Sequence, residues 1–213
     1  MTDCIVYGPA YSTFTRSVCI TLEEKGVAYS LEHVDLLGGA HQQEPHLSKH
    51  PFGKVPGFAH GDFELYEALA AMFYIDEAFD GPSLQPDDNR ERARMRQILG
   101  VINSYAYPSW ITNILMPRVV VPMMGGTSDE AQIAAALPLA QQSVTELERL
   151  VGASPYCAGS VLSLADLHLA PLYDYLSQTP EGETMLADAP NLLRWWASMG
   201  TRPSVEKTKP SLG

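Results

Sequence analysis

The chain has 213 residues, 46% of them hydrophobic, enough to bury one large core or two modest ones, which argues against a disordered protein. Its formal net charge of −11 and isoelectric point near 4.9 argue against nucleic acid or anionic membrane as main partner, because both are bound chiefly through basic patches. No uninterrupted apolar span reaches membrane length, and the N-terminus lacks a basic segment followed by an apolar run, so we expect a soluble cytoplasmic protein.

The chain contains three cysteines, Cys4, Cys19 and Cys157, which form no C-x-x-C pair and show no metal-ligand spacing. A disulfide framework needs several paired cysteines, and a zinc site needs closely spaced cysteine or histidine ligands. We therefore expect no bound metal and three buried, unreactive thiols, since free cysteine is among the most buried residue types.

The N-terminal segment predicts a β-α-β unit. Asp3–Tyr7 (DCIVY) is a short apolar run typical of a buried strand, and Gly8-Pro9 ends it. A helix is expected from Thr13 to Lys25, closed by Gly26. Residues 28–35 (AYSLEHVD) alternate apolar and polar side chains as a second strand does. The intervening helix supplies the crossover that a parallel strand pair needs.

Residues 36–48 are expected to form a loop, because a glycine pair and a proline interrupt any long helix. The next segment, PFGKVPGF, places Pro56 inside an apolar run, where proline removes a ladder hydrogen-bond donor. We expect a cis Val55-Pro56 bond, which leaves the backbone N–H and C=O of Val55 free to pair with an extended, peptide-like ligand.

A β-hairpin and a helix follow this segment. Residues 60–62 (HGD) are the expected turn and residues 63–65 (FEL) the return strand. A helix is then expected to begin at Glu67 and Ala68, with an apolar face formed by Leu69, Met72, Phe73 and Ile75. The unpaired N–H groups of its first turn favour an anionic ligand group.

The second half of the chain is predicted to be helical. Residues 81–88 (GPSLQPDD) are rich in turn residues and are typical of a linker. A helix is expected over residues 89–106, followed by a break over residues 117–126 (PRVVVPMMGG). Residues 129–151 predict a long helix, in which Pro138 implies a kink or a boundary.

The C-terminal part carries one further local signal. Ser163 and Asp166 have the spacing of a capping box at a helix start, which is a structural feature. A final helix is expected over residues 190–199, and the tail after Arg202-Pro203 is expected to be irregular.

The segment PFGKVP, followed by a hairpin and an acidic residue at a helix start, resembles the thioredoxin-like domain of cytosolic glutathione transferases, most closely the serine-type phi, theta and bacterial classes. The Ser163/Asp166 box recurs in the C-terminal domain of that family. The resemblance covers almost the whole chain and implies an α/β plus all-α protein (GST fold). It implies a thioredoxin-like glutathione-binding domain over residues 1–80, a linker over residues 81–88, and an all-helical C-terminal bundle over residues 89–213.

The resemblance also implies a glutathione site in the first domain. In this family the Val55 backbone pairs with the cysteinyl part of glutathione, Glu67 holds the γ-glutamyl ammonium group, and the next residue binds the γ-glutamyl carboxylate. That residue is Ala68, where the family usually has serine. One hydroxyl donor is lost, so we expect binding weaker by about 1 kcal/mol.

The glycyl carboxylate of glutathione is implied to lie near His41 and Gln42. His41 is the better match, whereas Gln42 replaces a usual lysine and weakens the site further. Lys54 is another candidate for binding a carboxylate, with a solvated lysine as the alternative. The other loop histidines, His46, His50 and His60, are expected to be solvated.

The first strand-to-helix turn, YGPAYSTFTR, resembles the active-site loop of the phi class, in which a serine just before the helix contacts the glutathione sulfur; Ser12 matches it. A free thiol with a pKa of about 8.5 is only a few per cent ionised at neutral pH, so a hydroxyl donor and a helix N-terminus raise the thiolate fraction. From spacing alone Ser12 is an ordinary N-cap, and the two roles are compatible. Tyr7 has the position of the catalytic phenol in tyrosine-type transferases, but a core or interface aromatic is the favoured interpretation.

Five residues are candidates for the pocket of the second substrate, which the resemblance implies to be apolar: Tyr11, Tyr105, Tyr107, Trp110 and Ile114. For the four in the second half of the chain, the alternative is the core of the helical domain.

The resemblance therefore implies a cytoplasmic, homodimeric glutathione S-transferase of detoxification, which attacks a small apolar electrophile with the thiolate of its co-substrate glutathione. The alternatives are a non-catalytic glutathione-binding or interaction protein of the same fold, and a glutathione-dependent dehalogenase or isomerase that shares the thiolate step. A peroxidase or thiol transferase is less favoured, because the active-site turn contains no cysteine.

Overall fold

The computed structural model describes residues 3–210. Their contacts form two compact units: unit 1 runs to Leu84 and includes the segment from Arg202 onward, and unit 2 is Gln85–Thr201. The boundary after Leu84 lies inside the predicted linker. The sequence-based division assigns the segment from Arg202 onward to the helical domain, whereas its contacts group it with unit 1.

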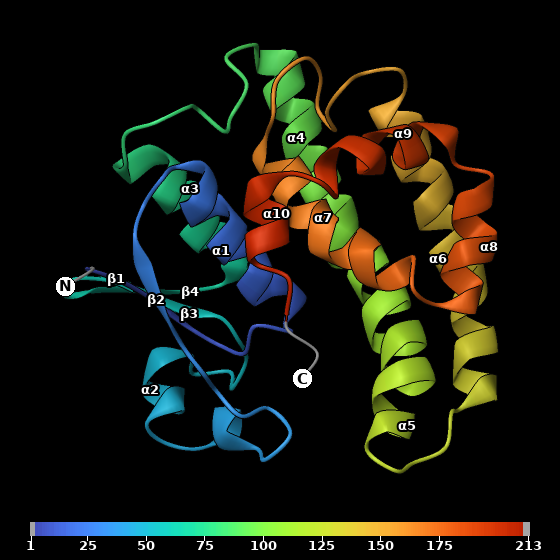
Figure 1. Cartoon of the computed structure of the whole chain (residues 1–213), viewed down its shortest axis with the longest axis horizontal. Helices are drawn as coiled ribbons and strands as arrows, with labels where there is room; N and C mark the ends of the chain where they lie inside the picture. Colours follow the sequence, from blue (N-terminus) through green and yellow to red (C-terminus); the bar gives the residue numbers. More distant parts are fainter. Residues whose placement is uncertain (1–2, 211–213) are drawn as a thin grey trace. The chain divides into compact units, whose positions relative to one another are not determined.

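Unit 1 contains a four-stranded mixed sheet in the order β2-β1-β3-β4 (Figure 1). Its strands are β1 (Cys4–Tyr7), β2 (Tyr29–Glu32), β3 (Gly57–His60) and β4 (Phe63–Tyr66). β1 pairs in parallel with β2, with Cys4 opposite Tyr29, and antiparallel with β3, which in turn pairs antiparallel with β4. The predicted β-α-β unit and hairpin are confirmed, with small shifts at the strand ends.

The helices of unit 1 are α1 (Thr13–Glu24), the 3₁₀ turn η1 (Ala40–Gln42), α2 (His46–Lys49), α3 (Ala68–Ala78) and α10 (Pro203–Lys207). α1 and α3 pack against each other on one face of the sheet, and α2 lies on the other face (Figure 1). The core of this unit consists of buried apolar side chains from the sheet and from both helices: Val6, Phe58, Val18, Ile20, Leu22, Met72 and Ile75. Each such burial stabilises the fold by roughly 1.5–3 kcal/mol.

The α10 helix corrects the expectation of an irregular tail. The guanidinium of Arg202, its N-cap residue, forms two hydrogen bonds of 2.6 Å with the carboxylate of Glu24 in α1, and the Ser204 hydroxyl donates to the same carboxylate. A five-residue helix is not stable by itself in water, so α10 depends on these contacts with Glu24. Glu24 is remote in sequence, so local pattern does not predict the helix.

A buried ion pair joins α1 to α3. The Lys25 ammonium lies 3.2 Å from Asp76 Oδ1 and donates to the carbonyl oxygens of Asp76 and Pro82 at 3.0 and 3.1 Å. The Leu84 N–H donates to Asp76 Oδ1 at 2.8 Å. Both charges are paired and hydrogen-bonded, which burial requires, and they fix residues 82–84 against unit 1.

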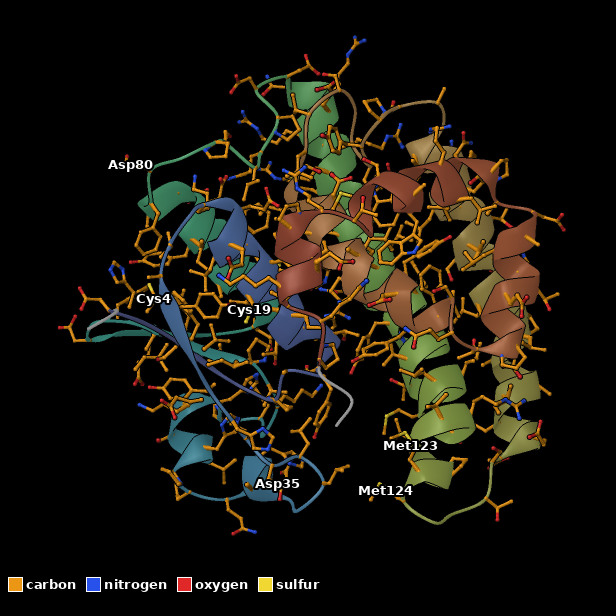
Figure 2. All side chains as sticks on the ribbon, in the orientation of Figure 1. Cys4, Cys19, Asp35, Asp80, Met123 and Met124 are labelled. Atoms are coloured by element: carbon orange, nitrogen blue, oxygen red, sulfur yellow. The ribbon has the colours of Figure 1, made fainter. Side chains whose placement is uncertain are left out.

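All three cysteines are buried, as predicted, with exposed fractions of 2% for Cys4, 3% for Cys19 and 1% for Cys157. Figure 2 labels Cys4 and Cys19 on β1 and α1. Burial raises the pKa of Cys19 to about 12, so its thiol is not ionised at neutral pH and has little nucleophilic character.

Unit 2 is helical throughout. Its helices are α4 (Asn89–Val101), the π-helix η2 (Ile102–Val120), α5 (Val121–Met123), α6 (Glu130–Val151), α7 (Leu164–Leu176), α8 (Pro180–Ala187) and α9 (Pro190–Met199). Figure 1 shows α6 alongside the helix that continues from α4 through α5. Among residues 3–210, no helix combines the length and the apolar character that crossing a bilayer requires.

The break predicted over residues 117–126 is wrong, because the chain stays helical through Met123. Pro108 and Pro117 both lie inside η2. Proline removes one backbone donor, but the helix continues past it here, as α6 continues past Pro138 and α7 past Pro171, because tertiary packing overrides local propensity. Pro138 likewise lies inside one uninterrupted helix, α6, rather than at a boundary. Met123 and Met124, at the end of α5, are 74% and 61% exposed (Figure 2).

The predicted capping box is confirmed at the start of α7. The fully buried Asp166 carboxylate accepts hydrogen bonds from the Ser163 N–H at 2.9 Å and from the Ser163 hydroxyl at 2.7 Å. It also accepts from the Cys157 N–H at 2.7 Å and from Trp195 Nε1 of α9 at 2.8 Å. The box therefore ties α7 to the preceding loop and to α9, in addition to starting the helix.

His168, fully buried in α7, gives a pH-dependent stability. Its Nε2 donates to Asn103 Oδ1 at 2.8 Å, and burial lowers its pKa to about 3. The unfolded chain, in which this pKa is near 6.5, takes up a proton first as the pH falls, so stability is lost between about pH 6.5 and pH 3. From pH 7 to pH 5 the expected loss is about 2 kcal/mol.

The variant His168→Gln keeps a donor for Asn103 and lacks this titration. We expect the difference in unfolding free energy between wild type and variant, from urea denaturation, to shrink by that amount between pH 7 and pH 5. Equal slopes in the two proteins would contradict a neutral native His168.

Candidate active site

Ser12 lies in the β1–α1 turn and is the N-cap residue of α1. Its backbone is extended, with φ −72° and ψ 128°, and its Oγ accepts a hydrogen bond from the Thr15 N–H at 3.4 Å. The Ser12 N–H donates to the Pro9 carbonyl at 3.1 Å, which closes the turn. Accepting from the backbone uses a lone pair of Oγ and leaves the hydroxyl hydrogen able to donate to a ligand. The predicted N-cap is confirmed, and its geometry is compatible with a second role.

Gly8 brings this turn close to the segment that carries Val55. A Cβ added to Gly8 would lie 2.4 Å from Thr15 Oγ1, 3.2 Å from Thr15 Cγ2 and 3.3 Å from Val55 Cβ. The Gly8 N–H donates to the Glu32 carbonyl of β2 at 2.9 Å, so the backbone cannot shift freely to make room. The close approach of α1 to Val55 therefore depends on the missing side chain.

Val55 presents an unused backbone edge. The Val55-Pro56 bond is cis, as predicted, and the Glu44-Pro45 bond is cis as well. Within residues 3–210, neither the N–H nor the C=O of half-buried Val55 has a hydrogen-bond partner. Exposed backbone groups of this kind can pair with an extended ligand.

Glu67 and Ala68 occupy the start of α3. Glu67 is exposed and has φ 72°, a region that a non-glycine residue adopts at a cost and that is common at ligand sites. This backbone turns the chain from β4 into α3. Ala68, the first residue of the helix, is 7% exposed. The N–H groups of the first turn of α3 have no partner within the helix, which favours a carboxylate there.

The carboxylate-binding candidates differ in how far they are committed to other contacts. The Gln42 amide donates to the Gly53 carbonyl at 2.8 Å, so this side chain fastens η1 to the following loop. His41 in η1 is half-buried, and its buried Nδ1 has no hydrogen-bond partner among residues 3–210. Lys54 is exposed, and its carbonyl oxygen lies 2.6 Å from His46 Nε2.

The expectation of solvated histidines is wrong for His46 and His50, which are 6% and 2% exposed. Their rings stack on each other with centroids 6.4 Å apart. His60 is half-buried, with its Nδ1 2.8 Å from the Tyr74 hydroxyl. Local sequence gives no signal for this burial, because it results from α2 packing beside β4.

The sequence predicts a packing role for Tyr7 and a place in the pocket of the second substrate for Tyr11. The ring of half-buried Tyr7 lies 5.4 Å from Lys49 Nζ and packs beside Gly57, so it is engaged in packing. Tyr11 is 37% exposed. Partial burial and the nearby Asp35 carboxylate raise the pKa of Tyr11, whereas a backbone hydrogen bond with Leu36 lowers it. The pKa is raised overall, so the phenol stays neutral.

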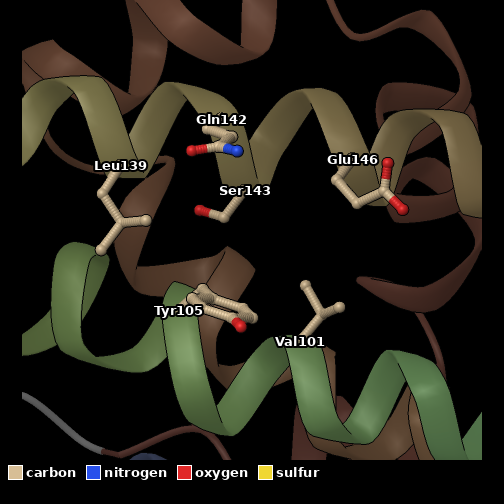
Figure 3. A pocket seen from close by; sticks show the side chains of 6 residues that line it. All are labelled: Val101, Tyr105, Leu139, Gln142, Ser143 and Glu146. Carbon is tan, nitrogen blue, oxygen red and sulfur yellow. The ribbon is translucent and has the colours of Figure 1, made fainter.

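Of the four candidates for the electrophile pocket in unit 2, two are buried in the core and two keep exposed surface. Trp110 and Ile114 are completely buried, and Trp110 Nε1 donates to the Ala140 carbonyl at 3.3 Å, so both form part of the core. Tyr107 is half-buried, and burial raises its pKa. Tyr105 is 51% exposed and faces a cavity of about 320 Å³. Figure 3 shows this cavity between the helix carrying Val101 and Tyr105 and the α6 side chains Leu139, Gln142, Ser143 and Glu146.

Comparisons with known proteins agree with this arrangement. The model of the glutathione S-transferase N-terminal domain matches residues 3–77, and that of the C-terminal domain matches residues 111–203. The chain is 33% identical over 205 residues to glutathione S-transferase F9 of Arabidopsis thaliana, which covers 95% of this chain and 94% of that relative. The chain belongs to the glutathione S-transferase family.

Solved structures of the family share the fold. Glutathione transferase F7 from Populus trichocarpa superimposes with a TM-score of 0.86 at 31% identity, covering 96% of this chain and 97% of that one. Glutathione S-transferase I from maize, in complex with an atrazine glutathione conjugate, gives a TM-score of 0.84 at 29% identity and covers 98% and 99%. The thioredoxin-like domain and the helical domain expected from the resemblance are confirmed. Among residues 3–210 of this transferase, no group of three or more His, Cys, Asp or Glu side chains is placed to hold a metal ion.

The variant Gly8→Ala tests the close approach of α1 to Val55. The added Cβ overpacks the contact with Thr15, so we expect the unfolding free energy to fall by about 1–3 kcal/mol. Affinity for glutathione, measured by calorimetry, should fall as well, because the turn that carries Ser12 must move relative to Val55.

Gly100→Ala is the matched control, since a Cβ at Gly100 in α4 meets nothing within 4 Å. This helical substitution should stabilise unit 2 by about 0.5–1 kcal/mol and leave glutathione affinity unchanged. A Gly8→Ala protein with normal stability and normal affinity would rule out the packing constraint.

Proposed function

We propose that this glutathione transferase ionises the thiol of bound glutathione through the Ser12 hydroxyl and conjugates the resulting thiolate to a small apolar electrophile. The observation that carries the proposal is the position of Ser12, with its Oγ capping the N-terminus of α1 and its hydroxyl hydrogen not needed for the cap. A thiolate beside this helix end receives a hydrogen bond and lies at the positive end of the helix dipole.

The chemical step follows from the thiol pKa. Free thiols have a pKa of about 8.5, and lowering it by about two units requires roughly 2.7 kcal/mol of preferential stabilisation of the thiolate. The thiol proton passes to solvent, the sulfur electron pair forms the new bond to the electrophilic carbon, and the leaving group departs with its own electron pair. Ser12 keeps its proton throughout, because it acts as a hydrogen-bond donor.

The remainder of glutathione is assigned to groups along the same edge of unit 1. The unpaired N–H and C=O of Val55 pair with the cysteinyl backbone, and exposed Glu67 holds the γ-glutamyl ammonium group. The Ala68 N–H binds the γ-glutamyl carboxylate. His41 and Lys54 are the candidates for the glycyl carboxylate. Gln42 contributes indirectly, by holding the loop at Gly53.

The electrophile is proposed to contact Tyr11 and the aromatic side chains Tyr105 and Tyr107, which retain accessible surface. Trp110 and Ile114 support this region as core residues rather than as contact surface. An aromatic lining favours apolar second substrates.

A non-catalytic glutathione-binding protein is the second candidate. It is favoured by two departures from the family's site, the missing hydroxyl at Ala68 and the commitment of the Gln42 amide to Gly53. A dehalogenase or isomerase activity uses the same thiolate and differs only in the electrophile.

The variant Ser12→Ala tests the thiolate mechanism. We expect the pKa of the bound thiol, followed by ultraviolet thiolate absorbance, to return towards about 8.5. If the serine lowers it by about two units, the thiolate fraction at pH 7 falls roughly 25-fold, and the conjugation rate falls in proportion. Retention of a low thiol pKa in the variant would assign the mechanism to another group.

Asp129→Ala is the matched control for lost capping. Asp129 is the N-cap of α6 and accepts from the Gln132 N–H at 2.9 Å. Both substitutions remove a cap worth about 0.5–2 kcal/mol, and only Ser12→Ala should change the thiol pKa.

Ala68→Ser should restore a carboxylate donor. One added hydrogen bond contributes about 1 kcal/mol, so glutathione is expected to bind about fivefold more tightly by calorimetry. Ala70→Ser, at an exposed position of the same helix, should leave affinity unchanged. Equal affinities in both variants and the wild type would remove Ala68 from the γ-glutamyl carboxylate site.

The proposal includes a cytoplasmic homodimer. Buried free thiols suit a reducing compartment, and large exposed apolar side chains suit a protein interface. Phe52 is 67% exposed, and its ring centroid lies 6.0 Å from that of Tyr66 and 6.3 Å from that of His50. Phe52→Ser should shift the molecular mass in sedimentation velocity from dimer towards monomer. Leu193→Ser, which removes another exposed apolar side chain, should leave the mass unchanged. A dimer unaffected by Phe52→Ser would move the interface elsewhere.

A further inference from the structure

His50 is a buried histidine directly beneath the turn that carries Glu67. It follows α2 as its C-cap, is 2% exposed, and its ring centroid lies 5.2 Å from that of Tyr66, the residue preceding Glu67. Its backbone is fixed on both sides, since its N–H donates to the His46 carbonyl at 2.9 Å and its C=O accepts from the Gly53 N–H at 2.8 Å.

The His50 ring has one nitrogen without a hydrogen bond to another described residue. Its buried Nδ1 makes no hydrogen bond to any other residue in the part of the chain that the structure describes. Buried polar atoms are nearly always paired, so an unpaired one needs a specific reason. His46 and His60, by contrast, use a ring nitrogen on the Lys54 carbonyl and the Tyr74 hydroxyl.

Four titratable groups on three elements surround His50. His46 belongs to α2 and stacks on the ring, Lys54 belongs to the loop before β3, and Tyr66 and Glu67 belong to β4 and the turn after it. Burial lowers the pKa of His50, the Glu67 carboxylate opposes that shift, and His46 and Lys54 add to it. His50 is therefore neutral at neutral pH, and Glu67 is the anion that its protonated form attracts.

We propose that His50 is a positioning residue for the γ-glutamyl end of glutathione: its neutral ring supports the Tyr66–Glu67 turn, and its protonation in acid competes with the ligand's ammonium group for Glu67. The inference rests on the proposed role of Glu67. It predicts that glutathione affinity falls as the pH is lowered. This loss is separate from the ionisation of the thiol near Ser12.

The direction of the coupling follows from linkage. A bound ammonium group pairs with Glu67 and removes the attraction that favours protonated His50, so the ligand lowers the pKa of His50. By reciprocity, protonated His50 weakens the ligand by the same factor. One coupled proton limits the effect to a tenfold loss of affinity per pH unit.

The experiment uses S-methylglutathione, whose blocked thiol cannot titrate, and measures its dissociation constant by calorimetry from pH 5 to pH 7. In this range the ligand's amino group stays protonated, so the charge that pairs with Glu67 does not change. We expect the wild-type affinity to fall below about pH 6.5, by no more than tenfold per pH unit, and the affinity of His50→Gln to be independent of pH. His60→Gln, which removes a histidine bonded to Tyr74, should keep the wild-type profile.

Nuclear magnetic resonance of the wild-type protein gives a readout that a purely structural role would not move. The pKa of His50 should fall when S-methylglutathione binds, and Glu67→Gln should abolish that fall. If His50→Gln does not fold, as judged by circular dichroism, this titration decides alone. An unchanged pKa of His50, or an acid-induced loss retained in folded His50→Gln, would overturn the inference and leave the proposed function intact. A wild-type protein that binds no S-methylglutathione at any pH would overturn the glutathione site on which both depend.

Discussion

The site depends on one steric constraint, the absence of a side chain at Gly8. An added Cβ there would come within 2.4 Å of Thr15 Oγ1 and within 3.3 Å of Val55 Cβ. Because Thr15 is also the residue whose N–H is capped by Ser12, this contact connects the start of α1, where Ser12 is proposed to bind the glutathione sulfur, to the backbone of Val55. Gly8 and Val55, which are remote in sequence, are thereby brought together at the proposed glutathione site.

Most of this candidate site consists of backbone groups and short side chains. The N-terminus of α1, the free edge at Val55 and the first turn of α3 are available whichever side chains surround them, provided the fold holds them in place. The two departures at Ala68 and Gln42 affect side-chain donors and leave these backbone donors intact, because Ala68 lacks a hydroxyl and the Gln42 amide bonds to Gly53. It also explains why a buried residue such as His50 can influence binding, since it acts on the position of the turn that carries Glu67.

In unit 2, one buried carboxylate, that of Asp166, holds several elements together. Asp166 collects donors from the loop before α7, from the helix start and from Trp195 in α9. A buried carboxylate is costly unless its hydrogen bonds are satisfied, so these elements must assemble together for any of them to be stable. Of the aromatic residues of η2, Trp110 is buried in the core of unit 2, whereas Tyr105 and Tyr107 keep exposed surface.

The sequence by itself determined the features whose physics is local. The cap at Ser12, the cis bond at Pro56, the hairpin and the Ser163/Asp166 box each require a few adjacent residues, and the resemblance carried by PFGKVP identified the family. Only the tertiary structure decided the features that depend on distant partners. These are the burial of His46 and His50, the continuation of the helix through Pro117, the anchoring of α10 by Arg202 and Glu24, and the Lys25–Asp76 pair. In each case the deciding free energy comes from contacts between elements remote in the chain, which propensity and spacing do not encode.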